Sequence, residues 1–141
     1  MRKPWRTDKS KEIGLQKVRV LDIVEYPKGL GSGINRCIQL KKANESGQYI
    51  PGCKESKKSI QQVLEESSNS QDCIKECLKS YCGGLYEILV GRRKMSPIDF
   101  NIALAEYKGK YYPHGSGHHR ICIAKRTRVE LIEAEVIMYW D

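Results

Sequence analysis

The stretch that decides the fold is residues 111–120, which read Tyr111-Tyr112-Pro113-His114-Gly115-Ser116-Gly117-His118-His119-Arg120. All three histidines of the chain lie in it. A strand-like segment ends just before it, and a helix-like segment, residues 121–127, follows it. Gly115 and Gly117 give the backbone dihedral angles that other residues resist and allow close approach to a ligand. The stretch therefore predicts a strand, a glycine turn and the start of a helix.

The chemistry of this turn points to an anion. Peptide N–H groups at a helix start carry partial positive charge and are open to a phosphate. His118, His119 and Arg120 add side-chain donors at the same place, and an arginine can donate to two phosphate oxygens at once. We interpret the turn as a phosphate-binding loop. The open alternative is an ordinary turn whose histidines face solvent.

The chain has 141 residues, the length of one domain, and a net charge of +8 from 25 Lys and Arg against 17 Asp and Glu. This excess favours polyanions such as DNA, although it also serves plain solubility. We expect a nucleic-acid-binding surface at two dense basic clusters, namely Arg92, Arg93 and Lys94, and Lys125, Arg126 and Arg128.

No apolar run is long enough for a membrane helix, and the first residues lack the apolar core of a secretory signal. The expectation is a cytoplasmic protein without a membrane partner. The six cysteines are then more consistent with free thiols than with disulfides. A zinc site built from Cys53, Cys73, Cys77 and Cys82 is the less favoured alternative because the spacing lacks a Cys-x-x-Cys pair. No metal site is predicted.

Periodicity along the rest of the chain predicts one α+β domain with a small mixed sheet and two or three helices. A basic N-terminal arm covers residues 1–16 and the domain covers 17–141, with an inserted loop around 27–58. The expected strands are residues 17–26, 85–90, 100–107, 110–112 and 130–139, with a short strand at 37–40 inside the loop. The expected helices are residues 58–66, 71–82 and 121–127, the second ended by Gly83-Gly84.

This order of elements, together with Gly117-His118-His119-Arg120 followed by Ile121-Cys122-Ile123-Ala124-Lys125, resembles the ParB/sulfiredoxin superfamily. The resemblance is best over residues 85–136. It implies that Gly115, Ser116 and Gly117 face phosphate oxygens and that His119 and Arg120 contact the phosphates. It also implies a nucleoside triphosphate (ATP or CTP) as ligand, with Mg²⁺ as an accompanying ion. Arg36 is the nearest match, a poor one, to an upstream arginine of the partitioning proteins.

The superfamily includes partitioning proteins, nucleases, free-serine kinases and sulfiredoxin. Sulfiredoxin-like members carry a cysteine where this chain has His118, and kinase-like members carry an aspartate where it has Ser116. The expected function is therefore an NTP-binding, DNA-associated protein with NTPase or nuclease activity, in which His118 is the catalytic base. The alternatives are a free-serine-kinase-type phosphotransferase and a non-catalytic binding module. The apolar residues 137–140 suggest a surface for a second copy of the chain.

Overall fold

The computed structural model describes residue 5, residues 7–95 and residues 101–141. Its elements, in order, are strand β1 (Lys9–Arg19), the 3-10 helices η1 (Val20–Asp22) and η2 (Lys28–Arg36), helices α1 (Ile38–Glu45), α2 (Ile60–Ser68), α3 (Gln71–Leu78) and α4 (Tyr81–Leu89), strands β2 (Ile102–Tyr107) and β3 (Lys110–Pro113), helix α5 (His118–Thr127) and strand β4 (Leu131–Trp140). The α+β class predicted from the sequence is confirmed. The described residues hold five α-helices, more than the two or three expected.

The four strands form one mixed sheet in the order β1-β4-β2-β3. Strand β4 pairs antiparallel with β1 and parallel with β2, and β2 pairs antiparallel with β3. The hairpin between β2 and β3 turns at Lys108 and Gly109, whose φ angles of 51° and 79° suit a two-residue turn of type I′. The predicted hairpin and the predicted last strand are therefore confirmed.

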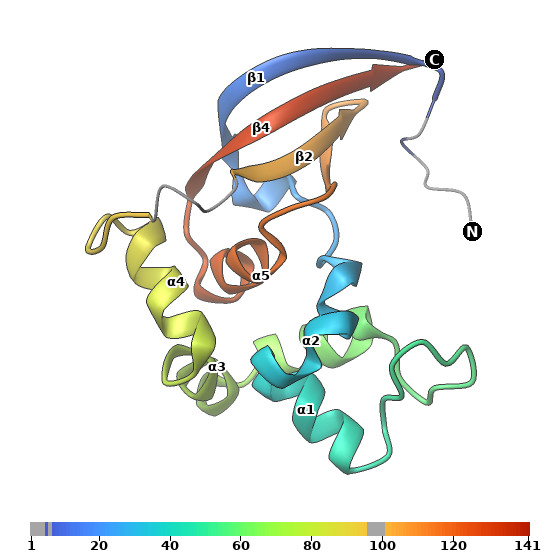
Figure 1. The fold of residues 1–141 in the computed structure, drawn as a ribbon, viewed down its shortest axis with the longest axis vertical. Coiled ribbons are helices and arrows are strands. Elements are labelled where there is room, and N and C mark those ends of the chain that lie inside the picture. Colours follow the sequence, from blue (N-terminus) through green and yellow to red (C-terminus); the bar gives the residue numbers. More distant parts are fainter. Residues whose placement is uncertain (1–4, 6, 96–100) are drawn as a thin grey trace.

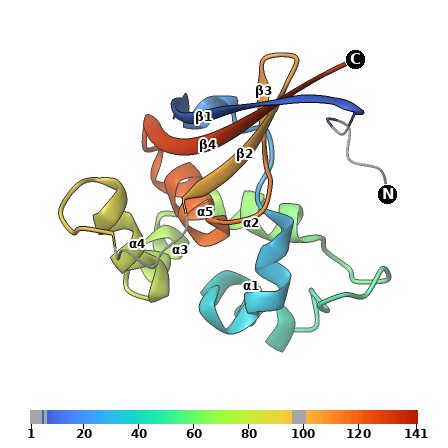
Figure 2. The ribbon, with the colours of Figure 1, turned by 45° about the horizontal axis from the view of Figure 1, so that its top comes forward.

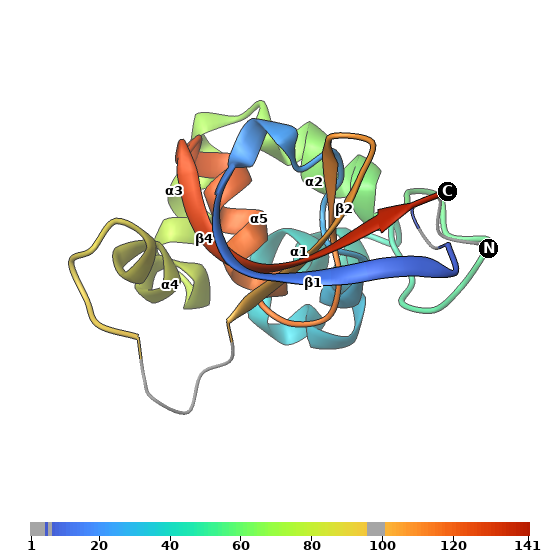
Figure 3. The same cartoon turned by 90° about the horizontal axis from the view of Figure 1, so that it is seen from above.

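The sheet and the helices form two layers, with the strands on one side and the helices on the other (Figure 1). Seen from above, the long strands β1 and β4 curve across the helical layer (Figure 3). Helix α5 lies directly under the sheet, and its Ile121, Ile123 and Ala124 are fully buried. This burial fixes the end of β3 and the start of α5, where the predicted phosphate-binding loop lies.

The first predicted segments are wrong in their boundaries. Residues 9–16, predicted as part of an irregular arm, belong to β1, whereas the predicted strand at 17–26 ends at Arg19 and continues as η1. Strand β1 shows no alternation because most of its residues are exposed, and its pairing is supplied by β4, more than 110 residues away. Residues 1–4 and 6 of the predicted arm lie outside the described residues.

The predicted inserted loop at 27–58 is wrong in its first part, whereas residues 46–58 form no helix or strand, as expected. Most of its first half forms η2 and α1, and the predicted strand at residues 37–40 is the start of α1. Leu30 and Leu40 are buried there in a second core cluster with Tyr49 and Leu64. The glycines of this segment suggested a loop, but tertiary packing holds it in helical turns.

The predicted strand at residues 85–90 is helix α4, and Gly83-Gly84 does not end a helix but lies inside this one. A Cβ on Gly83 would lie 1.9 Å from the carbonyl oxygen of Leu78, at the end of α3. The glycine therefore permits the close corner between α3 and α4. Within the described ranges, no helix combines the length and the apolar character needed to cross a bilayer.

Candidate functional site

The loop predicted to bind phosphate lies between β3 and α5, and Gly117 is the N-cap of α5. Its φ and ψ of 85° and 21° are left-handed, and no side chain caps the helix. A Cβ on Gly117 would lie 2.8 Å from Cγ1 and 2.9 Å from Cα of Ile102. Both the dihedral angles and the space therefore require glycine at this position.

The same loop is held to β2 on one side and opens into α5 on the other. The N–H of His114 donates to the carbonyl of Ala103 (3.0 Å), and the N–H of Ala103 donates to the carbonyl of Ser116 (3.2 Å). The first hydrogen bond of α5 runs from the N–H of Ile121 to the carbonyl of Gly117 (2.9 Å). The helix itself therefore does not use the N–H groups of residues 118–120, as at every helix start.

A cavity of ≈ 400 Å³ lies beside this helix start. Its lining comes from three parts of the chain, namely the end of η2, helix α4 with the turn after it, and the loop with the first turn of α5. The lining residues are Arg36, Tyr81, Leu85, Ile88, Met95, Ser116, Gly117, His118, His119 and Arg120. Helices α4 and α5 are neighbours in two views of the molecule (Figures 1 and 2). The structure thus brings Arg36, 80 residues upstream in the sequence, to the predicted loop.

Three of these side chains form a connected group. The guanidinium carbon of Arg36 lies 5.1 Å from the ring centroid of Tyr81, a cation–π distance. The Tyr81 ring meets the His119 imidazole edge to face, with centroids 5.2 Å apart and planes at 80°. An exposed arginine from η2, an aromatic ring from α4 and an imidazole from α5 are therefore in mutual contact at the cavity wall.

The environment of His119 keeps its ring neutral. Burial, the nearby Arg36 charge and the neighbouring His118 lower the pKa of His119 to about 4. Its Nδ1 is buried and finds no hydrogen-bond partner among the residues that the structure describes. A neutral imidazole with an unused buried nitrogen can turn or take up a proton when an anion approaches.

The other residues predicted for the loop play different parts. The His118 ring packs on η2, because its Nε2 would lie 2.7 Å from a Cβ added to Gly29. Arg120 is half-buried, and its guanidinium lies 3.2 Å from the Met95 sulfur. The Ser116 hydroxyl donates to the carbonyl of Asn101 (2.5 Å) and so is engaged inside the loop.

Gly115 is not among the described residues that line the cavity, although its neighbour Ser116 is. It is exposed, with a φ of 112° and its missing side chain directed at Ala103. Its observed part is to let the chain turn from β3 toward Gly117. The structure therefore brings Ser116, Gly117, His118, His119 and Arg120 together and leaves Gly115 at the edge.

The first predicted basic cluster lies on the turn that follows α4. Arg92, Arg93 and Lys94 are exposed. Arg93 forms an ion pair with Glu87 (3.1 Å) and lies over Gly84, while the next residue but one, Met95, lines the cavity. This cluster is therefore at the surface and adjoins the candidate site.

The second predicted basic cluster is divided by the fold. Arg128 is exposed, whereas Lys125 is half-buried, donates to the carbonyl of Ile23 and lies over the Tyr26 ring. Burial lowers the pKa of Lys125. Arg126 is only 3% exposed and donates to the Leu64 carbonyl and to the hydroxyls of two serines at the end of α2. The prediction that Arg126 contacts nucleic acid is wrong, because its helix face points into the core.

The cysteines are free, and four of them, Cys37, Cys77, Cys82 and Cys122, are buried. Burial raises the pKa of the Cys82 thiol to about 12 and that of Cys122 well above its usual value. Across the described parts of the chain, no group of three or more His, Cys, Asp or Glu side chains is placed to hold a metal ion. These thiols serve as small apolar side chains of the core.

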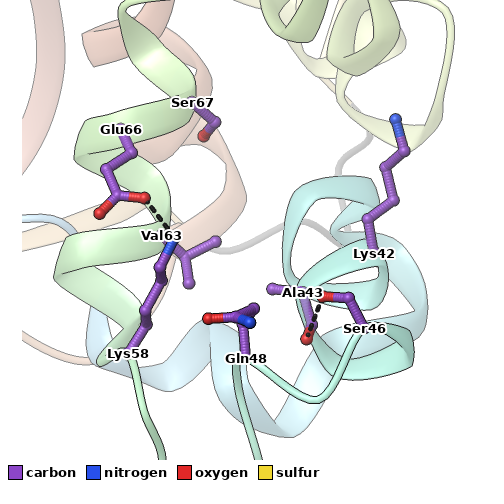
Figure 4. Close-up of a pocket in the computed structure, with 8 residues that line it drawn as sticks. All are labelled: Lys42, Ala43, Ser46, Gln48, Lys58, Val63, Glu66 and Ser67. Atoms are coloured by element: carbon purple, nitrogen blue, oxygen red, sulfur yellow. Dashed lines mark hydrogen bonds and ion pairs between the residues drawn. The ribbon is translucent and has the colours of Figure 1, made fainter.

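A second cavity, of ≈ 470 Å³, lies between α1 and α2 (Figure 4). Lys58 pairs with Glu66 at 2.6 Å along its wall, and Lys42 is directed away from it toward Glu76, also at 2.6 Å. Because its charges are already paired, this cavity offers a weaker attraction to an anion than the cavity at α5.

The sequence prediction missed Tyr81, Leu85 and Ile88 as site residues, because it ended the helix of Tyr81 at residue 82 and placed residues 85–90 in a strand. Their spacing of four and three residues is that of one helix face and was the available signal. Comparison with family models, with curated proteins and with solved structures finds no match for this chain.

Proposed function

We propose that the cavity at the start of α5 binds the phosphates of a nucleoside triphosphate, ATP or CTP, in a DNA-associated protein of the ParB/sulfiredoxin type. The observation that carries this proposal is the convergence of Arg36, His119 and Arg120 on one cavity beside the start of helix α5. Two guanidinium groups provide donors in a planar fork that matches phosphate oxygens.

The electrostatics favour a polyanionic ligand over a neutral one. The lining holds two arginines and two histidines, and no Asp or Glu is among the residues that line it within the described ranges. The neutral His119 can accept a proton and add a third positive charge once phosphate oxygens lie beside it. A triphosphate would bring its own Mg²⁺, which this lining has no carboxylate to hold.

DNA association is supported by the position of the exposed basic residues. Arg92, Arg93 and Lys94 adjoin the candidate site, and a separate cavity of ≈ 750 Å³ has the exposed Arg19 and Arg128 in its lining, together with the half-buried Lys125 and with Glu130. Such residues contact the phosphate backbone and give affinity that falls with salt. We therefore place the DNA contacts on these surface residues and exclude the buried Arg126.

For chemistry at the site, His118 remains the predicted general base. Its ring lines the cavity while it packs on Gly29, so it is held in one position beside the proposed phosphates. With no carboxylate in the lining, a histidine is the side chain there that can accept a proton near neutral pH.

The test is calorimetric titration of the whole chain with Mg-ATP and Mg-CTP at low salt. Wild type is expected to bind at least one of them, and Arg120→Gln is expected to weaken that binding roughly 10- to 100-fold, the loss of about 1.5 to 3 kcal/mol from charged hydrogen bonds. Arg128→Gln is the matched control, since it removes the same charge from a surface away from the cavity. No binding by wild type, or equal loss in both variants, contradicts the proposal.

The activity is tested in parallel by NTP hydrolysis and plasmid integrity, with and without Mg²⁺, DNA and serine. The DNA-associated function predicts that binding to duplex DNA weakens steeply with salt and that replacing Arg92, Arg93 and Lys94 by Gln reduces the salt dependence. Intact plasmid together with NTP consumption only when serine is present would instead indicate the phosphotransferase.

A further inference from the structure

The wall of the cavity that faces the α5 helix start is apolar and aromatic. Tyr81, Leu85 and Ile88 project from α4 into the lining, and their spacing of four and three residues places them on one helix face. They line the same cavity as the residues proposed to bind phosphate. The cavity lining therefore combines cationic and apolar side chains.

This face of α4 borders the face that builds the core. Cys82, Leu85, Tyr86 and Leu89 belong to the core cluster formed with Ile123 of α5, so Leu85 both packs against this core and lines the cavity. Tyr81, by contrast, is 46% exposed, and Ile88 is half-buried. A single exposed apolar side chain is ordinary, but Tyr81, Leu85 and Ile88 share one cavity lining with two arginines and two histidines, as expected for an amphipathic ligand.

The Tyr81 ring is close to two of the residues that are proposed to bind phosphate. Its centroid lies 5.1 Å from the guanidinium carbon of Arg36 and 5.2 Å from the centroid of the His119 ring, which it meets in a T-shaped arrangement. The guanidinium of Arg36 is itself planar, so a face of the ring already accepts a planar partner. At ≈ 400 Å³ the cavity is within the size range of sites for small organic ligands, and much larger than a phosphate group requires.

We infer that the Tyr81, Leu85 and Ile88 face of α4 receives a planar, apolar part of the same ligand, the base of a nucleotide, stacked on the Tyr81 ring. This inference rests on the proposed function, since it assumes that the phosphates lie at α5. The base replaces the Arg36 guanidinium over the ring, and Arg36 turns to the phosphate oxygens. Tyr81 is thus a specificity-determining residue that separates nucleotides from phosphate compounds without a base.

The test compares two probes with similar charge, a nucleoside triphosphate (ATP, then CTP) and inorganic tripolyphosphate, by calorimetry on the whole chain. Base–aromatic stacking predicts that wild type prefers the nucleotide roughly 5- to 150-fold and that Tyr81→Ala abolishes the preference. Tyr81→Phe keeps the ring and is expected to keep the preference. Tyr107→Ala, which truncates a tyrosine of β2 outside this cavity, controls for the loss of an aromatic side chain.

The outcomes separate this inference from the proposed function. If both probes bind equally, Tyr81→Ala changes neither and Arg120→Gln weakens both, the phosphate site stands and the base-binding wall is refuted. If neither probe binds wild type, both proposals are overturned. Nucleotide preference that is lost in Tyr81→Ala, with tripolyphosphate binding unchanged, supports both. Circular dichroism of each variant confirms that the fold is retained.

Discussion

The protonation of His119 makes the stability of the protein depend on pH in one specific window. The pKa of His119 is lowered to about 4, by burial first and then by Arg36 and His118, against an ordinary value near 6.5. Between these two values the unfolded chain binds a proton at this histidine and the folded chain does not. Stability therefore falls as the pH drops from about 7 to about 4, and this group adds no dependence above pH 7.

The size of the effect follows from the shift. The difference between a pKa near 6.5 and a pKa of about 4 corresponds to at most about 3.4 kcal/mol, and partial exposure of the ring reduces this to about 1 to 2 kcal/mol. His119→Gln removes the titrating group and keeps a neutral polar side chain of similar size. Between pH 7.5 and pH 4.5 the free energy of unfolding of the wild type is expected to fall by about 1 to 2 kcal/mol more than that of this variant. All other titrating groups are common to both proteins.

The assay is urea unfolding at several pH values, combined with NMR titration of the imidazole signals, in which His119 is identified by its absence from the variant. Arg36→Leu is the second arm, since removing this charge is expected to raise the pKa of His119 partway, burial remaining the larger cause. Identical pH slopes in wild type and His119→Gln, or an NMR pKa at or above 6.5, would refute the reasoning. A phosphate bound at the site as proposed would raise the pKa of His119, so the proposal predicts that nucleotide affinity rises as the pH falls toward 5.

Three further changes test the local structure, each by urea unfolding. Gly117→Ala is expected to cost about 2 to 4 kcal/mol from the left-handed φ and the contact with Ile102, whereas Gly47→Ala, with a φ of 77° and open space, is expected to cost about 1 kcal/mol. Arg126→Met is expected to be at least as stable as wild type, because the buried guanidinium has two nitrogens without partners among the described residues; a loss above 2 kcal/mol would show that its bonds to α2 outweigh the buried charge. Ser59→Ala is expected to cost about 1 kcal/mol through the capping box of α2.

The elements best predicted from the sequence are those with a local signal. The hairpin is marked by Lys108-Gly109, and the start of α5 by Gly117. Strand β4 is marked by the alternation of buried and exposed residues in its first half. In each case the signal, either a glycine required by the backbone or a periodic pattern, is contained in a segment of about ten residues. The element can therefore be predicted without knowing which distant residues it contacts.

The elements predicted wrongly depend on distant contacts or on ambiguous runs. Residues 85–90 form a short apolar run, which periodicity alone does not assign to strand or helix. Gly83 looked like a helix stop, yet its role is to admit the Leu78 carbonyl at the α3–α4 corner. The second basic cluster was predicted to form one nucleic-acid-binding surface. Arg126, however, follows Cys122 by four positions, so the two residues share the buried face of α5.

The candidate site combines the start of α5, which was predicted well, with η2 and α4, which were predicted as a loop and a strand. His118 connects α5 to η2. Its ring lies against Gly29 so closely that an added Cβ would be 2.7 Å from Nε2. Gly29 belongs to η2, which ends at Arg36, and His118 begins the helix that carries Arg120. A shift of η2 is therefore expected to move α5, and the reverse, because closely packed groups are not easily compressed. The contact between Gly29 and the His118 ring, together with the packing of Leu30 and Cys122 in the second core cluster, therefore helps to position Arg36 relative to Arg120. For that reason a residue predicted as a base also has a positioning role, and its substitution is expected to disturb binding as well as any chemistry.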